Sequence, residues 1–292
     1  MERSVLKVGG NELDDVDFVC GLIDALRELW QTREVALVHG GGKAIARLQE
    51  RLCLQTRFVD GLRVTDDESL DVAEMVLSGW VNKRLVARLV SAGIPAVGLS
   101  GVDNGLFRVV KMTHNTHDLG WVGDIIETDP STIESMLAHG VTPVISPISL
   151  GLDGHTYNVN ADHAAAALAC ALGAEELVFV SNVPGVLRGV DAYASRRLCG
   201  TVAYCAASTA DTEHPADTEH RRDSGNACAG RDCVPALTST DVESLIASGE
   251  INGGMVPKVR SALFALEKGV PRVRITNLEG LPADGGTCFL KE

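Results

Sequence analysis

Short apolar runs alternate with longer amphipathic runs along most of the chain, and this alternation constrains the fold more than any other feature. Runs typical of buried strands cover residues 5–10, 34–41, 94–101, 141–149, 176–183 and 272–277. Runs with apolar residues at helical spacing cover residues 14–30, 43–52, 66–93, 130–140, 161–173, 239–249 and 256–269. This order predicts an α/β fold with a largely parallel central sheet and helices on both faces, a three-layer sandwich. Ligands of such sheets bind beyond the carboxyl ends of the strands.

Local signals predict how three of these helices begin or bend. The helix over 66–93 is expected to bend or break near Gly79. Thr240 and Glu243 have the spacing of a capping box for the helix over 239–249. Pro257 is favourable as the first residue of the next helix, which places Lys258 in its first turn.

The segment 194–236 interrupts the alternation and contains the direct repeat ADTEH. We predict a mobile surface insertion there. It contains four cysteines and two histidines: Cys199, Cys205, Cys228, Cys233, His214 and His220. Their spacings, C-x5-C and C-x4-C, differ from the tight pairs of ordinary zinc sites, so we predict no metal site.

Length and charge exclude several classes of protein. The 292 residues suffice for one large or two modest domains, and the formal net charge of -13 argues against affinity for nucleic acid or anionic membranes. There is no apolar run of about 18 residues and no signal-peptide core. We predict a cytoplasmic protein whose eight cysteines are free thiols.

Three glycine-rich corners indicate phosphate binding. Lys7 stands just before Gly9 and Gly10, the run 40–42 precedes a helix, and Gly253-Gly254 precede Lys258. A helix start offers unpaired N–H groups and partial positive charge, and glycines let an anion approach them. One such corner is explained equally well by a tight turn, but three corners with two lysines suit the charge of a phosphoryl-transfer transition state.

Polar residues near residue 160 form a second group. Asn158, Asn160 and Asp162 alternate along an extended entry to a helix, which brings them to one side. Asp162 is also explained as a dipole-favoured residue of the first helical turn, with Asn160 as its cap. Arg63 is predicted in a loop, either as a solvated charge or as a clamp on a carboxylate.

Motifs of other phosphate-binding and hydrolytic classes are missing from the sequence. The chain contains neither the P-loop pattern G-x-x-x-x-G-K-[ST] nor a G-x-G-x-x-G that opens a helix. It also lacks the H-R-D and D-F-G motifs of protein kinases and the G-x-S-x-G of hydrolases. The phosphate-binding corners therefore belong to another class.

Taken together, the motifs resemble those of the acetylglutamate kinases, in the amino acid kinase superfamily. The resemblance runs almost end to end, and the set of motifs in this order is highly specific. The matching pieces are KVGG (7–10), HGGG (39–42), DGLRVTD (60–66), EMVLSGWVNKRLV (74–86), GLSGVD (98–103), VGDI (122–125), YNVNADHAAAALA (157–169), SNVPGVL (181–187) and GGMVPKV (253–259).

The resemblance implies ATP-dependent phosphorylation of the side-chain carboxylate of N-acetyl-L-glutamate with Mg2+, the second step of arginine biosynthesis. It implies that Lys7 and Lys258 stabilise the transferring phosphoryl group and that Asp162 orients them. The positions that it assigns to the phosphoryl group, the nucleotide or the substrate are Gly9, Gly10, Gly41, Gly42, Arg63, Asn158, Asn160, Ser181, Asn182 and Gly185. Among them, Arg63 is expected to hold the α-carboxylate.

Some residues depart from the family pattern and leave alternatives open. Asn182 stands where many members carry Asp, and Lys43 where many carry Pro. SNVPG and VNKRLV are also similar to kinases of lysine biosynthesis that act on a carrier-bound aminoadipate, and other members may accept N-succinylglutamate. A regulatory module that has lost catalysis is a further alternative, although both lysines and the aspartate are present.

The resemblance also implies two lobes and a dimer. Residues 1–173 are expected to bind the acyl-amino acid, and residues 174–292 to bind ATP. The chain begins almost at the first strand, whereas arginine-inhibited members carry an extra N-terminal helix. We therefore expect a homodimer without strong feedback, so that micromolar arginine leaves the activity unchanged in a titration.

Overall fold

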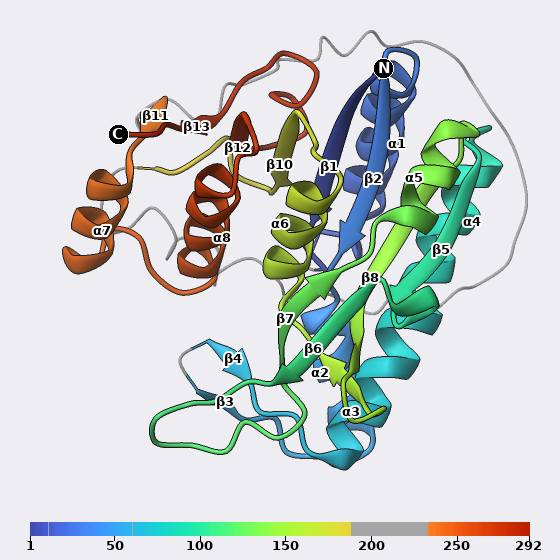
Figure 1. Ribbon diagram of the computed structural model, residues 1–292, viewed down its shortest axis with the longest axis vertical. Helices are drawn as coiled ribbons and strands as arrows, with labels where there is room; N and C mark the ends of the chain where they lie inside the picture. Colours follow the sequence, from blue (N-terminus) through green and yellow to red (C-terminus); the bar gives the residue numbers. More distant parts are fainter. Residues whose placement is uncertain (11, 60, 188–232) are drawn as a thin grey trace, which may run out of the picture.

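One large β-sheet runs through the molecule and carries helices on its two faces (Figure 1). The computed structural model describes residues 1–10, 12–59, 61–187 and 233–292. The strands are β1 (Glu2–Val8), β2 (Arg33–His39), β3 (Phe58–Val59), β4 (Leu62–Arg63), β5 (Ala96–Gly101), β6 (Phe107–Lys111), β7 (Gly123–Thr128), β8 (Thr142–Gly151), β9 (Thr156–Asn158), β10 (Glu176–Val180), β11 (Ala236–Leu237), β12 (Arg272–Thr276) and β13 (Thr287–Phe289). The α-helices are α1 (Val16–Trp30), α2 (Gly42–Arg51), α3 (Asp67–Glu74), α4 (Asn82–Ser91), α5 (Ser131–Ala138), α6 (Ala161–Ala171), α7 (Ser239–Ala247) and α8 (Met255–Glu267).

The strand order is β11-β13-β12-β10-β1-β2-β8-β6-β7, and β5 and β9 also pair with β8. The central pairs β12–β10, β10–β1, β1–β2 and β2–β8 are all parallel. Antiparallel pairing is confined to β12–β13, β6–β7 and β8–β9 within this sheet. The predicted largely parallel α/β sheet is therefore confirmed.

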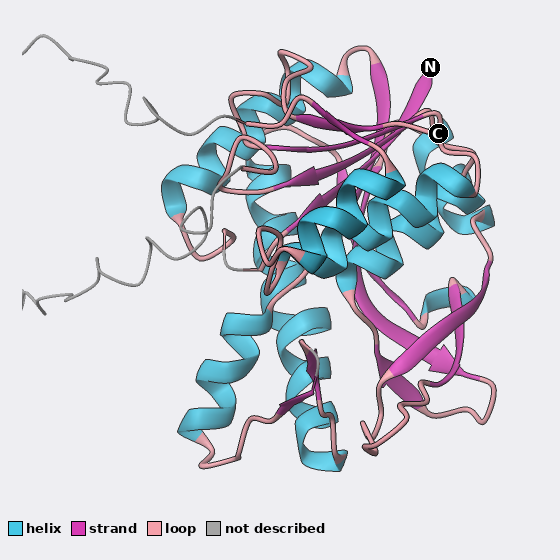
Figure 2. Cartoon of the chain, turned by 90° about the vertical axis from the view of Figure 1, so that its left-hand side faces the viewer, coloured by secondary structure: helices cyan, strands magenta, loops and turns pink. Residues whose placement is uncertain are grey.

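Alternate residues of the central strands enter different cores, as strand geometry requires. In β1, Val5 packs in the core formed with α5, α6, α7 and α8. Leu6 and Val8 pack in the core formed with α1 and α4. Figure 2 shows the strands with helices on both sides, which is the expected three-layer arrangement. Lys7 shares the face of Val5, so its side chain is directed to the layer that contains α6 and α8.

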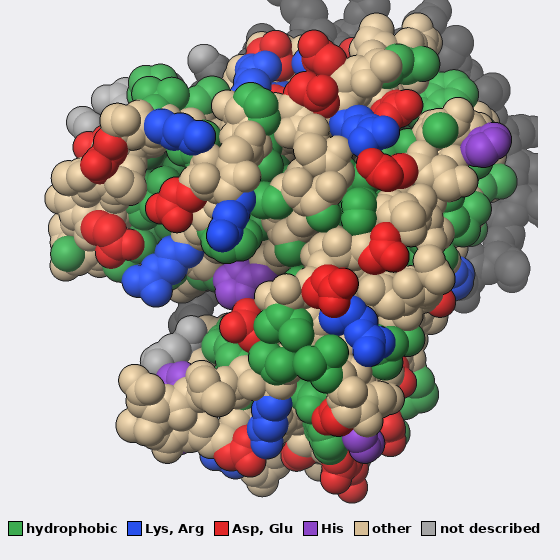
Figure 3. All heavy atoms as spheres, viewed as in Figure 1, with side chains coloured by type: hydrophobic (Ala, Val, Ile, Leu, Met, Phe, Trp, Pro, Cys, Tyr) green, Lys and Arg blue, Asp and Glu red, His purple; other side chains and the backbone are tan. Residues whose placement is uncertain are grey.

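The ten-residue strand β8 extends beyond the central sheet and connects it to a second part of the molecule. Its first half pairs with β2 and β5, and its second half with β6 and β9. The hairpin of β3 and β4 lies in this second part, beside α2 and α3 (Figure 1). In Figure 3 the surface is hollowed between this hairpin and the region of α7 and α8.

The long helical run is not broken at Gly79, since the chain stays helical from Asp67 to Ser91. Residues Met75–Val81 instead form a π-helix between α3 and α4. A π-helix inserts an extra residue into the turn, and such insertions are frequent at functional sites. Leu77 and Val81 of this segment pack against Gly41.

Two predicted helix starts are wrong by two residues. The cap of α7 is Thr238, which forms a capping box with Asp241, because the sequence offers two overlapping cap patterns. The N-cap of α8 is Gly254, so Pro257 is the third helical residue and Lys258 the fourth. Proline is still tolerated there, because N–H groups of the first turn have no partner within the helix.

The segment predicted as an insertion lies mostly outside the described residues. Of its four cysteines and two histidines, for which no metal site was predicted, only Cys233 is described. Residues 233–236 are described and rejoin the sheet. The backbone of Cys233 forms an antiparallel β-bridge with Leu187, and Ala236 begins β11. Residues 233–236, which the prediction assigned to the insertion, thus contact the sheet region. Within the described ranges, no helix has the length and apolar character needed to cross a bilayer.

Candidate active site

A cavity of about 510 Å³ opens at the carboxyl ends of β1 and β2, between α8 and the β3–β4 hairpin. Its volume lies in the range of roughly 300–1,000 Å³ that is usual for small-molecule sites. The sequence-predicted residues that line it are Lys7, Gly9, Gly10, Gly41, Gly42, Arg63, Asn158, Asn160, Asp162 and Lys258. Residues that are far apart in sequence thus meet at the sheet edge where a parallel α/β fold binds its ligands.

Asp162 lies between the two predicted lysines. Its Oδ1 is 2.7 Å from Lys7 Nζ, and its Oδ2 is 3.7 Å from Lys258 Nζ. Lys7 and Asp162 are buried, and 17% of the Lys258 side chain is exposed. One carboxylate therefore holds two ammonium groups at the wall of the cavity.

The protonation of this group follows from burial and charge. Burial alone raises the pKa of Asp162, but Lys7 and then Lys258 outweigh it, so that the pKa is below its ordinary value. The pKa of Lys258 is lowered, chiefly by burial and then by the charge of Lys7. Asp162 is accordingly an anion at neutral pH, compensating the two cations that it contacts.

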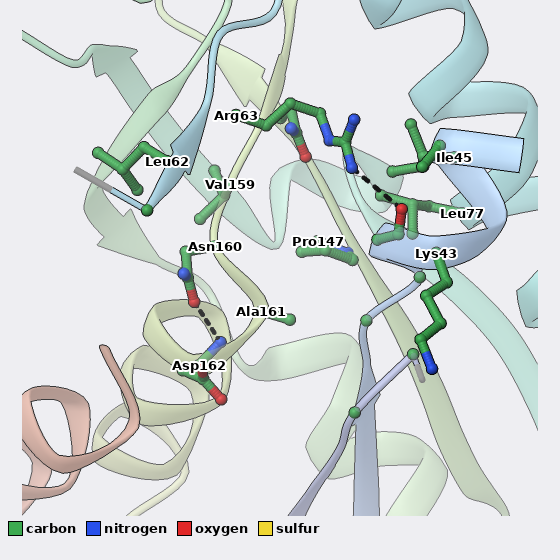
Figure 4. Close-up of a pocket in the computed structure, with 18 of the residues that line it drawn as sticks. Lys43, Ile45, Leu62, Arg63, Leu77, Pro147, Val159, Asn160, Ala161 and Asp162 are labelled. Atoms are coloured by element: carbon green, nitrogen blue, oxygen red, sulfur yellow. Dashed lines mark hydrogen bonds between the residues drawn. The ribbon is translucent and has the colours of Figure 1, made fainter. Parts of the chain in front are cut away.

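The start of α6 fixes the position of Asp162. Asn160 is the N-cap, and its Oδ1 accepts a hydrogen bond of 2.7 Å from the Asp162 N–H (Figure 4). The predicted cap is therefore confirmed. Because Asp162 stands in the first turn, the helix dipole also stabilises its negative charge.

The two glycine corners pack directly against each other. A Cβ on Gly10 would collide with the backbone of Gly41 and Gly40, so no larger residue fits there. Gly41 is the N-cap of α2 and has no side-chain cap bond. The N–H groups of the first turn of α2 therefore lie beside the cavity, where an anion can accept their hydrogen bonds.

Arg63 lies in the short strand β4 rather than in the predicted loop. Its Nη2 donates to Gly42 O at 3.0 Å (Figure 4). Its Nη1 donates to Gln49 Oε1 at 2.6 Å. Its guanidinium carbon is 4.8 Å from the centre of the Phe58 ring. Two bonds and the aromatic ring thus hold a cation at the cavity, as binding of a carboxylate requires. Asn158 belongs to β9 and donates to Thr65 Oγ1 at 3.3 Å.

Ser181, Asn182 and Gly185 do not line this cavity. They follow β10, whose last residue Val180 is paired with Val8, so they begin at the same edge of the sheet. Ser181 is buried, and a Cβ on Gly185 would meet Cys233 and Thr287. The structure therefore places these three residues near the site but not in the main cavity.

Two buried polar residues, His39 and Asn82, lie behind the second glycine corner and have no role predicted from the sequence. Both are fully buried, and Asn82 Nδ2 is 3.1 Å from His39 Nε2. The signal that could have found them is a polar residue placed where an apolar strand or helix face is expected.

His39 gives the unfolding free energy a defined pH dependence. The pKa of His39 is lowered to about 4, chiefly by burial. The hydrogen bond to Gly40 acts in the opposite direction, and the charge of Lys83 lowers the pKa further. Below pH 6.5 the unfolded state therefore binds more protons, and the native state loses stability as the pH falls. For an unfolded pKa of about 6.5, we expect a loss of about 2 kcal/mol between pH 7.5 and pH 5 from this residue.

Urea denaturation of wild type and His39→Asn at these two pH values measures that contribution. The variant should lose about 2 kcal/mol less than wild type between pH 7.5 and pH 5. Equal losses in the two proteins would mean that His39 does not cause the dependence.

The fold and the site define an α/β protein with two lysines and one aspartate at the wall of a small-molecule cavity, an arrangement that suits a phosphoryl group or a similar anion. Residues 2–205 match the Amino acid kinase family. The chain belongs to the amino acid kinase family.

Individual relatives are similar over almost the whole chain. The acetylglutamate kinase of Roseiflexus castenholzii is 47% identical over 291 residues, which cover 99% of this chain and 94% of that protein. The acetylglutamate kinase of Chloroflexus aurantiacus is 48% identical over 287 residues, which cover 98% and 96%. Among solved structures, smu.665 from Streptococcus mutans has a TM-score of 0.73 and 26% identity, with 98% of both chains covered. The resemblance found in the motifs is thereby confirmed.

Proposed function

We propose that the protein transfers the γ-phosphoryl group of ATP to the side-chain carboxylate of N-acetyl-L-glutamate, in the second step of arginine biosynthesis. The observation that carries this proposal is the contact of Asp162 with both Lys7 and Lys258 in a cavity that also contains Arg63. Two relatives that are 47% and 48% identical to this chain are named acetylglutamate kinase, which supports the proposal.

The reaction requires positioning and charge compensation rather than proton transfer. A carboxylate oxygen of the substrate forms a bond to the γ-phosphorus while the bond from that phosphorus to the β–γ bridging oxygen breaks, and ADP leaves with the electron pair. The nucleophile is already an anion, so no general base is needed. The products are ADP and N-acetyl-L-glutamyl 5-phosphate.

The lysines suit the charge that this reaction spreads over the phosphoryl oxygens. Lys7 and Lys258 present two cations, and Asp162 fixes their spacing. The uncapped start of α2 adds N–H donors on the side of Gly41. Contacts within the protein hold these groups in position, so little reorganisation is required during transfer.

The residues fit a nucleotide that carries its own magnesium. The described residues contain no group of three or more acidic, cysteine or histidine side chains that could hold a metal. Mg2+ commonly keeps water ligands and is held by substrate phosphates with one or two carboxylates. We propose that residues 174–292 bind ATP and that residues 1–173 bind the acyl-amino acid. Ser181, Asn182 and Gly185 would lie at the edge of the ATP site.

The structure supports a specific role for Arg63 as the ligand of the substrate's α-carboxylate. We expect Arg63→Ala to raise the KM for N-acetylglutamate by about 10–100-fold, because a charge-assisted bond contributes about 1.5–3 kcal/mol, and to change kcat less than fivefold. Steady-state kinetics measure both. Arg57→Ala is the matched control, since this exposed arginine lies nearby but outside the cavity. A fall in kcat at unchanged KM would contradict the role in binding.

The function is tested by measuring ADP release from Mg-ATP with one acceptor at a time: N-acetylglutamate, N-succinylglutamate, glutamate or N-acetylaminoadipate. We expect turnover with N-acetylglutamate. Turnover with another acid alone would keep the chemistry and contradict the proposed substrate. No turnover with any of the four would contradict the proposed function and favour a carrier-bound substrate or an inactive module.

We also propose that the enzyme is a cytoplasmic homodimer. Sedimentation velocity gives its mass in solution, and a monomer at micromolar concentration would contradict the dimer.

A further inference from the structure

A buried polar pair lies directly behind the glycine corner of the active site. His39 is the last residue of β2, and Asn82 is the first residue of α4. Both side chains are fully buried, and neither lines the cavity. Burying such groups is costly unless their hydrogen bonds are satisfied, so their bonds indicate what they do.

The bonds of this pair determine which ring nitrogen of His39 carries the proton. Nδ1 is 3.1 Å from Gly40 O, and a carbonyl oxygen only accepts, so Nδ1 is the donor. In a neutral ring Nε2 is then the acceptor, and it lies 3.1 Å from Asn82 Nδ2. The low pKa of His39 agrees with a neutral ring.

Asn82 connects this ring to the sheet. Its Nδ2 also lies 2.9 Å from Val144 O in β8 and 3.3 Å from Leu99 O in β5. Its Oδ1 accepts from Lys83 Nζ at 3.1 Å. A Cβ on Gly98 would collide with Asn82 Oδ1, so β5 leaves space for the amide. The amide is therefore held on several sides and cannot rotate without breaking bonds.

The orientation of the Gly40 carbonyl determines that of the next N–H. In a trans peptide, C=O and N–H point in opposite directions. Because Gly40 O faces His39, the Gly41 N–H faces away from it, on the side of Gly10 and the cavity. Without such a contact, three successive glycines would sample several peptide orientations.

We propose that His39 and Asn82 are positioning residues for phosphoryl transfer, which fix the Gly40–Gly41 peptide so that the Gly41 N–H faces the transferring phosphoryl group. This inference rests on the proposed function. Its expected effect is on kcat, because removing one preorganised donor from a developing anion costs roughly 10²–10³-fold in other enzymes. Leu77 and Val81 of the π-helix support Gly41 from the other side.

The first test reads the tautomer directly and does not depend on the substrate. We expect the ¹⁵N chemical shifts of His39 at pH 7 to show a neutral ring with the proton on Nδ1. A proton on Nε2, or a charged ring, would overturn the proposal. Even if the wild-type protein does not turn over N-acetylglutamate, which would refute the proposed function, this measurement still decides whether the bond to Gly40 exists.

The second test compares two variants of the same residue. An asparagine can place its Nδ2 near the position of the histidine Nδ1, so His39→Asn should keep the bond to Gly40 and retain kcat within about fivefold. His39→Leu cannot donate and should lower kcat about 100-fold, with the KM for N-acetylglutamate within threefold. Ser78→Ala is the control, since it removes a hydroxyl from the π-helix that also contains Leu77 and Val81. This hydroxyl is 2.8 Å from Ser146 Oγ of β8.

The two variants separate positioning from a structural role. Equal losses of kcat in His39→Asn and His39→Leu, or unchanged kcat in His39→Leu, would overturn the proposal. Should His39→Leu not fold, Asn82→Asp takes its place, because a carboxylate cannot donate to Nε2, and we expect kcat about 30-fold below wild type. If wild type prefers another acid, the same comparison is made with that acid.

Discussion

Lys258→Ala is expected to lower kcat by about 10³-fold and to leave the KM for N-acetylglutamate within threefold. Loss of a cation that compensates the transition state of phosphoryl transfer costs about 10³–10⁵-fold in other enzymes. Lys258 contacts Asp162 but lies outside the α-carboxylate site that we propose for Arg63, so ground-state binding of the acceptor should persist. Steady-state turnover at saturating Mg-ATP, with the acceptor varied, measures both constants.

The design of this experiment separates charge from stability. Lys268→Ala removes an exposed lysine just beyond the same helix and should retain full activity. Lys7→Ala should give a similar loss of kcat, together with lower stability, because it leaves the buried carboxylate of Asp162 with one cation instead of two. A loss below tenfold in Lys258→Ala would contradict the role of this lysine in the transition state.

The sequence predicts the central sheet because its strands are buried on both faces. Residues 141–149 and 176–183 read as continuous apolar runs, and these become β8 and β10. The glycine corners at 9–10 and 40–42 are predictable for a related reason, since they follow directly from the ends of the parallel strands β1 and β2. Parallel strands bring such positions to one edge without any knowledge of tertiary contacts.

Other features depend on contacts that local sequence does not specify. Residues 107–111 and 123–128 form β6 and β7 at the periphery of the sheet, where exposed residues interrupt the apolar pattern. Arg63 belongs to a two-residue strand, too short to give any periodicity. The apolar residues of the π-helix likewise keep ordinary helical spacing, so the sequence gives no sign of it. Its contacts with Ser146 and Gly41 are tertiary contacts that only the structure shows.

A buried charge hidden within an apolar run illustrates the same limit and leads to a large effect on stability. Glu176 begins β10, and its carboxylate accepts from Arg33 Nη1 at 2.6 Å and from Arg274 Nε at 2.7 Å. Arg272 Nε is 3.3 Å from Glu176 Oε1. These four residues lie at the starts of β2, β10 and β12, at the edge of the sheet opposite to the active site.

Glu176→Ala is expected to lower the free energy of unfolding by about 3–5 kcal/mol, because the buried Arg274 then keeps as its acidic partner only Asp284, an exposed residue 3.5 Å from its Nη2. Arg274 is fully buried and cannot move its guanidinium to water without disrupting the loop that it holds through Gly280, Leu281 and Gly285. Urea denaturation followed by circular dichroism measures the loss.

The neighbouring Glu175 provides the matched control, because it is exposed and its carboxylate accepts, among the bonds described, only from the backbone N–H of Arg3. Glu175→Ala should cost no more than about 1 kcal/mol, the usual value of one hydrogen bond. Both substitutions remove a glutamate carboxylate from adjacent positions of one segment, so they differ chiefly in burial and in the number of arginines that lose an ion pair. Equal losses would show that the arginines are solvated in the native state, and the buried network would then contribute little to stability.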